Sequence, residues 1–166
     1  NVPVIYPQRA GEDGIKDTLA HMSRLVTAAS THPLIRRQAA QAIQHCAPND
    51  RICQQAALMV WVQRQMRFVR DPHGIEALHD PVMIATAIDR KAQPYGDCDD
   101  FSMYLAALMR SVGLRANFRV VGFNGGKLSH VYVTGPKGEK LDSTRNPWNM
   151  AAGEMLPETQ ALNWRF

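Results

Sequence analysis

The hydrophobic pattern of the chain changes its period at Gly113, and this change constrains the fold more than any other feature. Before Gly113, apolar residues recur every three or four positions, as on one face of an α-helix. After Gly113, apolar and polar residues alternate in short runs separated by NGG and GPKG, which is typical of strands joined by tight turns. The sequence therefore predicts an α+β fold, with a helical N-terminal half packed on a small antiparallel sheet.

The helical half begins with three predicted helices. The first ends before Pro33, and the second runs from Leu34 into the turn at Cys46. Asp50 can cap the third helix, whose buried stripe is expected to contain Ile52, Ala56, Met59, Val62 and Met66. A short fourth helix is expected to start at Asp80-Pro81, because Asp is a good N-cap and Pro fits the first helical position.

The most regular helix is predicted from Cys98 to about Val112, with Gly113 at its end. Its inward face is formed by apolar residues at helical spacing: Phe101, Leu105, Leu108, Met109 and Val112. Cys98 then lies in the first turn, where the unpaired backbone amides stabilise a thiolate relative to a thiol. A cysteine nucleophile needs such a position.

Three strands are predicted after this helix, in ANFRVVGF, KLSHVYVT and EKLDS. An antiparallel meander places the second strand beside the third, and with them His130 beside Asp142. A catalytic thiol needs a base within hydrogen-bond reach and a third group that orients the base. His130 and Asp142 can supply these two groups. Residues 145–166 have no clear period, and we expect them to form a loose tail packed over the core.

Length and composition limit the other classes of function. A chain of 166 residues, 45% of them hydrophobic, can bury one good core, so we predict a single domain over residues 1–166. The 19 basic and 15 acidic residues are scattered along the chain, and nucleic-acid binding is not predicted. No apolar run has the length of a membrane span, and the first residues lack the pattern of a signal peptide. We therefore expect a soluble protein.

The three cysteines suggest one pair and one further thiol. A bridge between Cys46 and Cys53 would clamp the turn HCAPNDRIC and would imply an oxidising environment. Two reduced thiols packed at helix ends fit the spacing equally well. Zinc is less expected, because His21 and His45 are the only nearby partners and no second closely spaced pair completes a tetrahedral set.

The run GDCDDFSMYLAALMRSVGL, followed by SHVYV and then KLDST, resembles the core of the transglutaminase-like superfamily. The resemblance extends upstream through WVQRQMRFVRD and ALHDP, so it covers a core of about residues 46–144. It is nearest to short bacterial and prophage members, including the bacterial transglutaminase-like cysteine proteases. It implies a papain-like fold, a triad of Cys98, His130 and Asp142, and thiol acyl chemistry on an amide.

The resemblance also implies groups around the nucleophile. The oxyanion would be held by the Cys98 backbone amide and one side-chain donor, for which Gln93 is the candidate. The carboxylates of Asp97, Asp99 and Asp100 favour the first helical turn but disfavour a thiolate between them. Some bacterial relatives with a similar motif resolve this conflict with calcium, which could bind here; capping and solvent exposure are the alternative. No cofactor is required for the thiol chemistry itself.

Each member of the triad has a structural alternative. Cys98 could be a buried helix-start thiol, His130 a half-exposed strand residue, and Asp142 a turn cap before Ser143. The other histidines lie outside the meander and are expected to serve packing or solvent roles: His21, His32, His45, His73 and His79.

The sequence therefore leads to a cysteine peptidase or amidase that acts on a protein or peptide substrate. An amine in place of water as acceptor would make it a transamidase. The alternative from another class is an architectural or adaptor protein of a phage virion or tail, with phage structural proteins as partners. In that case Trp148, Trp164 and Phe166 of the tail could cover the cleft. The protein would be either exported, for instance to the periplasm, or associated with a virion.

Overall fold

The computed structural model describes residues 4–7, 11–71, 75–144 and 158–166.

Helix α5 (Cys98–Ser111) is the centre of the fold. Every α5 residue from Asp100 to Met109 is buried, so this helix has no solvent face over that length, whereas the sequence predicted one inward stripe. A helix that is buried all round needs neighbours on every side. They are α1 (Gly11–Ala29), α2 (Pro33–Ile43), α3 (Arg51–Gln65), α4 (Pro81–Asp89) and a sheet.

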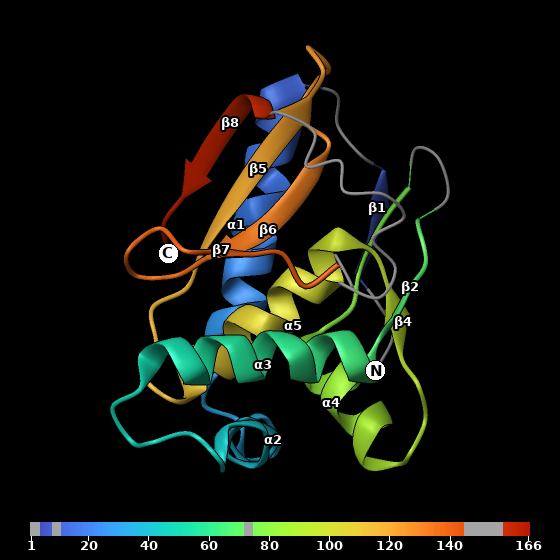
Figure 1. The fold of residues 1–166 in the computed structure, drawn as a ribbon. Helices are drawn as coiled ribbons and strands as arrows, with labels where there is room; N and C mark the ends of the chain where they lie inside the picture. The colour runs from blue at the N-terminus through green and yellow to red at the C-terminus, as the bar shows by residue number, and fades with distance from the viewer. Residues whose placement is uncertain (1–3, 8–10, 72–74, 145–157) are drawn as a thin grey trace.

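The sheet is antiparallel and four-stranded, in the order β7-β6-β5-β8. Its strands are β5 (Asn117–Phe123), β6 (His130–Thr134), β7 (Lys140–Leu141) and β8 (Glu158–Trp164). In Figure 1, α5 lies between this sheet above and α2, α3 and α4 below, with α1 behind the β5–β6 pair. The α+β class and the predicted meander are confirmed. Strand β7 is shorter than predicted, so Asp142 directly follows it.

Strand β8 is the main departure from the expected loose tail. Residues 158–164 pair along β5. Glu158 fixes β8 to the other strands, because its carboxylate accepts hydrogen bonds from Arg119, Tyr132 and Lys140. Burial alone would raise the pKa of Glu158, but these hydrogen bonds lower it to about 2. Such long-range side-chain contacts leave no periodic pattern in the sequence.

Two of the three aromatic residues expected to cover the cleft bind elsewhere. The Trp164 indole donates a hydrogen bond to the Ser23 hydroxyl over 2.9 Å. Phe166 stacks on Phe118 with 4.6 Å between ring centroids, and its carbonyl accepts from Arg110 in the last turn of α5. Cys98 lies at the opposite end of that helix. Trp148 lies outside the described residues.

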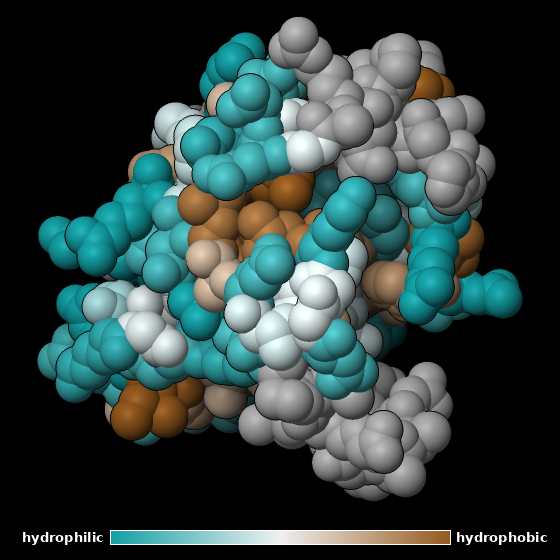
Figure 2. All heavy atoms as spheres, turned by 90° about the horizontal axis from the view of Figure 1, so that it is seen from above, coloured by the Kyte–Doolittle hydropathy of each residue, from teal (hydrophilic) through white to brown (hydrophobic). Residues whose placement is uncertain are grey.

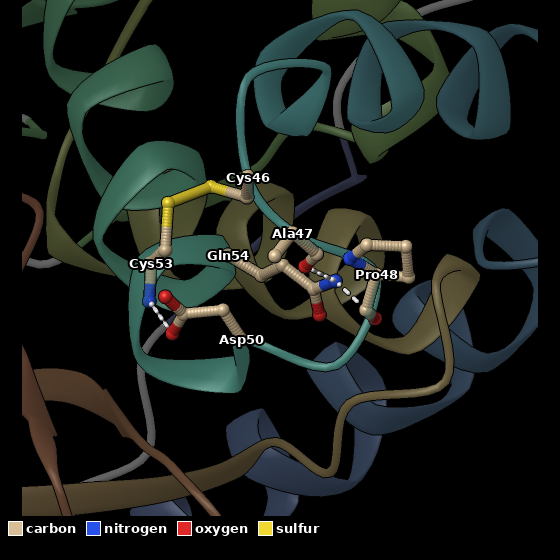
Figure 3. Close-up of a disulfide and its surroundings, with 6 residues drawn as sticks. All are labelled: Cys46, Ala47, Pro48, Asp50, Cys53 and Gln54. Atoms are coloured by element: carbon tan, nitrogen blue, oxygen red, sulfur yellow. Dashed lines mark hydrogen bonds between the residues drawn. A yellow bond between two sulfur atoms is a disulfide. The ribbon is translucent and has the colours of Figure 1, made fainter.

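The turn between α2 and α3 is closed by a disulfide between Cys46 and Cys53, whose Cα atoms are 5.7 Å apart (Figure 3). Asp50 caps α3 as predicted, accepting from the Cys53 backbone N–H. Gln54 points inward and donates to the carbonyls of Ala47 and Pro48. The contacts of this turn determine which side of α3 faces the core. The buried stripe predicted for α3 is therefore partly wrong.

The buried side chains of α3 are Gln54, Gln55, Leu58 and Val62. From the predicted stripe, Val62 and Met66 are buried, whereas Ala56 is exposed and the side chain of Ile52 is 76% exposed. An amide that satisfies the turn carbonyls takes the inward position that hydrophobicity alone would give to Ile52.

Two short strand pairs complete the description. Strand β1 (Val4–Pro7) pairs antiparallel with β3 (Ile75–Leu78), and β2 (Arg67–Phe68) pairs parallel with β4 (Tyr95–Gly96). The second pair holds the segment that leads into Cys98 against the chain that leaves α3. Within the described residues, no helix combines the length and the apolar character needed to cross a membrane.

Candidate active site

A cleft of about 130 Å³ lies between α1, the start of α5 and the start of β6. Its α1 wall is mainly apolar and includes Ile15, Leu19 and Met22. Cys98 and His130 both line it. Figure 2 looks onto the end of the molecule where α1 begins and the β5–β6 turn lies, and shows a hydrophobic area bordered by hydrophilic side chains.

Cys98 is the first residue of α5 and is half-buried. Asp97 caps the helix, because its carboxylate accepts the Asp99 backbone N–H over 3.0 Å. The Cys98 sulfur lies 3.7 Å from Oδ1 of Asp99. The disulfide engages the other two cysteines, so Cys98 is the one thiol of the chain that can react. Its position combines the helix N-terminus with access to the cleft.

His130 and Asp142 form a hydrogen-bonded pair, with 2.8 Å between Nε2 and Oδ2. The other carboxylate oxygen of Asp142 accepts from the Thr144 hydroxyl over 2.6 Å. Because the carboxylate accepts the proton on Nε2, a neutral His130 ring carries its lone pair on Nδ1. Both side chains are largely buried, with 17% of His130 and 5% of Asp142 exposed. Burial and two fixed carboxylate oxygens hold the ring in one tautomer.

The meander explains why two residues twelve positions apart meet. His130 begins β6, where it is the register partner of Val121, and Asp142 follows Leu141, the partner of Val133. The rings of Phe123 and Tyr132 flank His130 at 6.0 and 6.2 Å between centroids. The structure thus brings His130 to Asp142 directly and places Cys98 with His130 on one cleft.

Gln93, the candidate oxyanion donor, is placed differently. It is exposed and is not among the described residues that line the cleft. The next residues are held by the β2–β4 pair, in which the Pro94 carbonyl accepts from the Arg67 backbone. The structure therefore does not bring Gln93 to the cleft.

The three acidic residues around Cys98 do not converge on one calcium site. Asp97 and Asp99 lie beside Cys98. One carboxylate oxygen of each aspartate and the Cys98 sulfur all lie within 4.8 Å of one another. Asp100 is fully buried and accepts hydrogen bonds from His79, 2.7 Å to the backbone nitrogen and 2.8 Å to Nδ1. Asp100 is therefore neither a ligand beside Asp97 and Asp99, as the calcium hypothesis requires, nor a solvent-exposed charge, as its alternative requires. Calcium prefers six to eight oxygen ligands, so an ion held by Asp97 and Asp99 would need further oxygens from the backbone or from water.

The pairing of His79 with Asp100 was missed in the sequence, where His79 was expected to serve packing or solvent. The hydrogen bond with Asp100 raises the pKa of His79, although burial opposes it. Burial raises the pKa of Asp100 more than the bonds from His79 lower it. Both shifts favour keeping one proton on the pair. A signal was present, because Asp100 shares a helix face with Met103, Tyr104 and Ala107, and a buried acid needs a partner.

Comparisons of the chain with protein-family models, with curated proteins and with solved structures find no match. The chemistry of the site therefore follows from its residues and their positions. A thiol at a helix N-terminus, a histidine on the same cleft and a carboxylate that orients that histidine can together support nucleophilic attack and proton transfer.

Proposed function

We propose that this protein is a thiol-dependent amide hydrolase, a cysteine peptidase or amidase with a papain-like core of the transglutaminase type. One observation supports this most: His130, whose ring is held by Asp142, lines the same cleft as Cys98. The histidine is held by its Nε2 atom, so Nδ1 is the nitrogen that can exchange a proton with the thiol. Cys98 is the nucleophile, His130 the base and Asp142 the residue that orients the base.

The proposed reaction has two halves. The thiol proton moves to Nδ1 of His130 while the Cys98 sulfur forms a bond to the amide carbonyl carbon. The Cys98 backbone amide donates to the developing oxyanion. The proton then passes to the leaving amine as the C–N bond breaks, and a thioester remains. Water then attacks the thioester carbonyl and gives a proton to Nδ1. The C–S bond breaks, the acid leaves, and the proton on Nδ1 returns to the sulfur, which restores the thiol.

The substrate class is a protein or peptide amide. An amine that attacks the thioester in place of water would give transamidation, and we favour hydrolysis because the short bacterial members that the motifs resemble are proteases. The disulfide supports a compartment that keeps thiols oxidised, outside the cell or in the periplasm.

Alkylation of the intact protein tests the proposal without a known substrate. Limiting iodoacetamide at neutral pH should add one group, and peptide mapping should place it on Cys98. The rate should exceed that of an unstructured peptide thiol, because the helix end and His130 favour the thiolate. Cys98→Ser should remain unlabelled and should lack any amidase activity found by screening peptides against the wild type.

The architectural alternative predicts a different result. Cys98 would react no faster than an ordinary thiol, and the rate would be the same in His130→Ala. That outcome would overturn the hydrolase proposal. The architectural alternative was also favoured by the idea that the aromatic tail covers the cleft. That idea is weaker now, because Trp164 binds Ser23 and Phe166 packs on Phe118 and Arg110.

A further inference from the structure

The His79–Asp100 pair has no part in the reaction proposed above, although it lies beside the nucleophile. Asp100 is two residues after Cys98 and is 0% exposed. Removing a carboxylate from water is costly unless it is paired and hydrogen-bonded. Among the described residues, His79 donates two hydrogen bonds to Asp100. The burial of this carboxylate in the first turn of α5 therefore calls for a structural explanation.

The carboxylate of Asp100 lies where three segments meet. His79 directly precedes Asp80, the N-cap of α4. Gly96 belongs to β4, and a Cβ atom added there would lie 2.2 Å from Oδ2 of Asp100. No side chain other than hydrogen fits at position 96 unless Asp100 moves. The carboxylate thus joins the start of α4, strand β4 and the start of α5.

Helix geometry relates this junction to the thiol. Residues two positions apart on an α-helix point about 200° apart around its axis. Asp100 is buried on one side of the first turn, while Cys98 lines the cleft on the other. The junction therefore holds the first turn of α5 on the side away from the cleft.

We propose that His79 is a positioning residue for the Cys98 thiol: its backbone N–H and its Nδ1 atom hold Asp100, and this fixes the first turn of α5 toward His130. The inference rests on the proposed function.

Two replacements of His79 that carry the same amide group test the proposal. The amide nitrogen of Asn lies about where Nδ1 was, whereas that of Gln reaches toward the former Nε2. His79→Asn can keep the hydrogen bond to Asp100, and His79→Gln cannot keep it in that position. We expect Cys98 alkylation to slow by about tenfold in His79→Gln and to stay within about threefold of the wild type in His79→Asn.

A control separates positioning from general loss of stability. Tyr104→Phe removes buried hydrogen bonds to Trp61 and Gln38 from the same helix, farther from Cys98. It should lower the melting temperature and leave the alkylation rate near that of the wild type. Equal rates in the Asn and Gln variants, or equal slowing in Tyr104→Phe and His79→Gln, would overturn the role of His79. Failure of the hydrolase proposal looks different, because His130→Ala would then alkylate at the wild-type rate.

Discussion

Two histidine–aspartate pairs among the described residues lie on either side of the first turn of α5, and they differ in orientation and surroundings. In both, 2.8 Å separates the ring nitrogen from the carboxylate. His130 is bound through Nε2 and lines the cleft, whereas His79 is bound through Nδ1 and also by its backbone N–H. The same two residue types, histidine and aspartate, are thus paired once at the cleft and once in the buried junction of α4, β4 and α5.

The comparison shows that a short histidine–carboxylate contact does not by itself identify a catalytic base. The pair at the cleft leaves Nδ1 of His130 for proton exchange, while the pair behind the helix encloses its carboxylate completely. Proton transfer should therefore depend on the first pair, whereas the second pair should contribute most to stability and act on reactivity only through the position of Cys98. Each prediction below tests one side of this division.

Replacing the histidine at the cleft should have the largest effect. We expect His130→Ala to slow alkylation of Cys98 by about 100-fold, because the thiol loses its base. The exposed His45 provides a matched control, since it is adjacent to the disulfide rather than the cleft, and His45→Ala should react like the wild type. The rate is measured by intact mass over time. A loss in His79→Ala as large as that in His130→Ala would remove the distinction between the pairs.

Replacing the buried acid should have the largest effect on stability. Asp100→Asn removes the charge from a fully buried group that accepts two hydrogen bonds, and should lower the free energy of unfolding by about 2 kcal/mol. Denaturation by urea gives this value. Asp142→Asn is the comparison, with an expected loss of less than about 1 kcal/mol. If the two variants lose stability equally, the assignment of stability to the His79 pair is wrong.

Asp142→Asn should instead act on reactivity. The amide cannot accept the Nε2 proton as the carboxylate does, so part of the His130 population should lose the useful tautomer and orientation. We expect alkylation to slow by about tenfold, less than in His130→Ala. Thr144→Val is a milder test, because it removes only the hydroxyl that fixes the second oxygen of Asp142. Unchanged rates in both variants would contradict an orienting role for Asp142.

The sequence predicted the parts of this comparison that depend on local pattern. The period of α5, the turn at Asn124 and Gly125, and the alternation in β5 and β6 are local, and they led to Cys98, His130 and Asp142 as neighbours. Each of these elements contains its own signal over a few residues.

The sequence did not predict features that depend on contacts between distant segments. Strand β8 pairs with β5, and Glu158 at its start binds side chains from three other strands. His79 binds Asp100, which is 21 positions away in the sequence. The candidate role of Gln93 rests on its place shortly before Cys98 in the sequence, but Gln93 is exposed and does not line the cleft. Such contacts require the tertiary structure, which periodicity does not encode.

The smallest predicted effect concerns pH. The hydrogen bond with Asp100 raises the pKa of His79 above its ordinary value of 6.5, and the charges of Asp71 and Asp97 add to this. A raised folded-state pKa contributes stability that is fully present below pH 6.5 and is lost as the pH rises through the folded value. The melting temperature of the wild type should therefore fall more steeply above pH 6.5 than that of His79→Asn, because the asparagine at position 79 does not titrate while all other groups are shared. Parallel curves for the two proteins would mean that His79 is not charged in the pair, and that only its hydrogen bonds join α4 to α5.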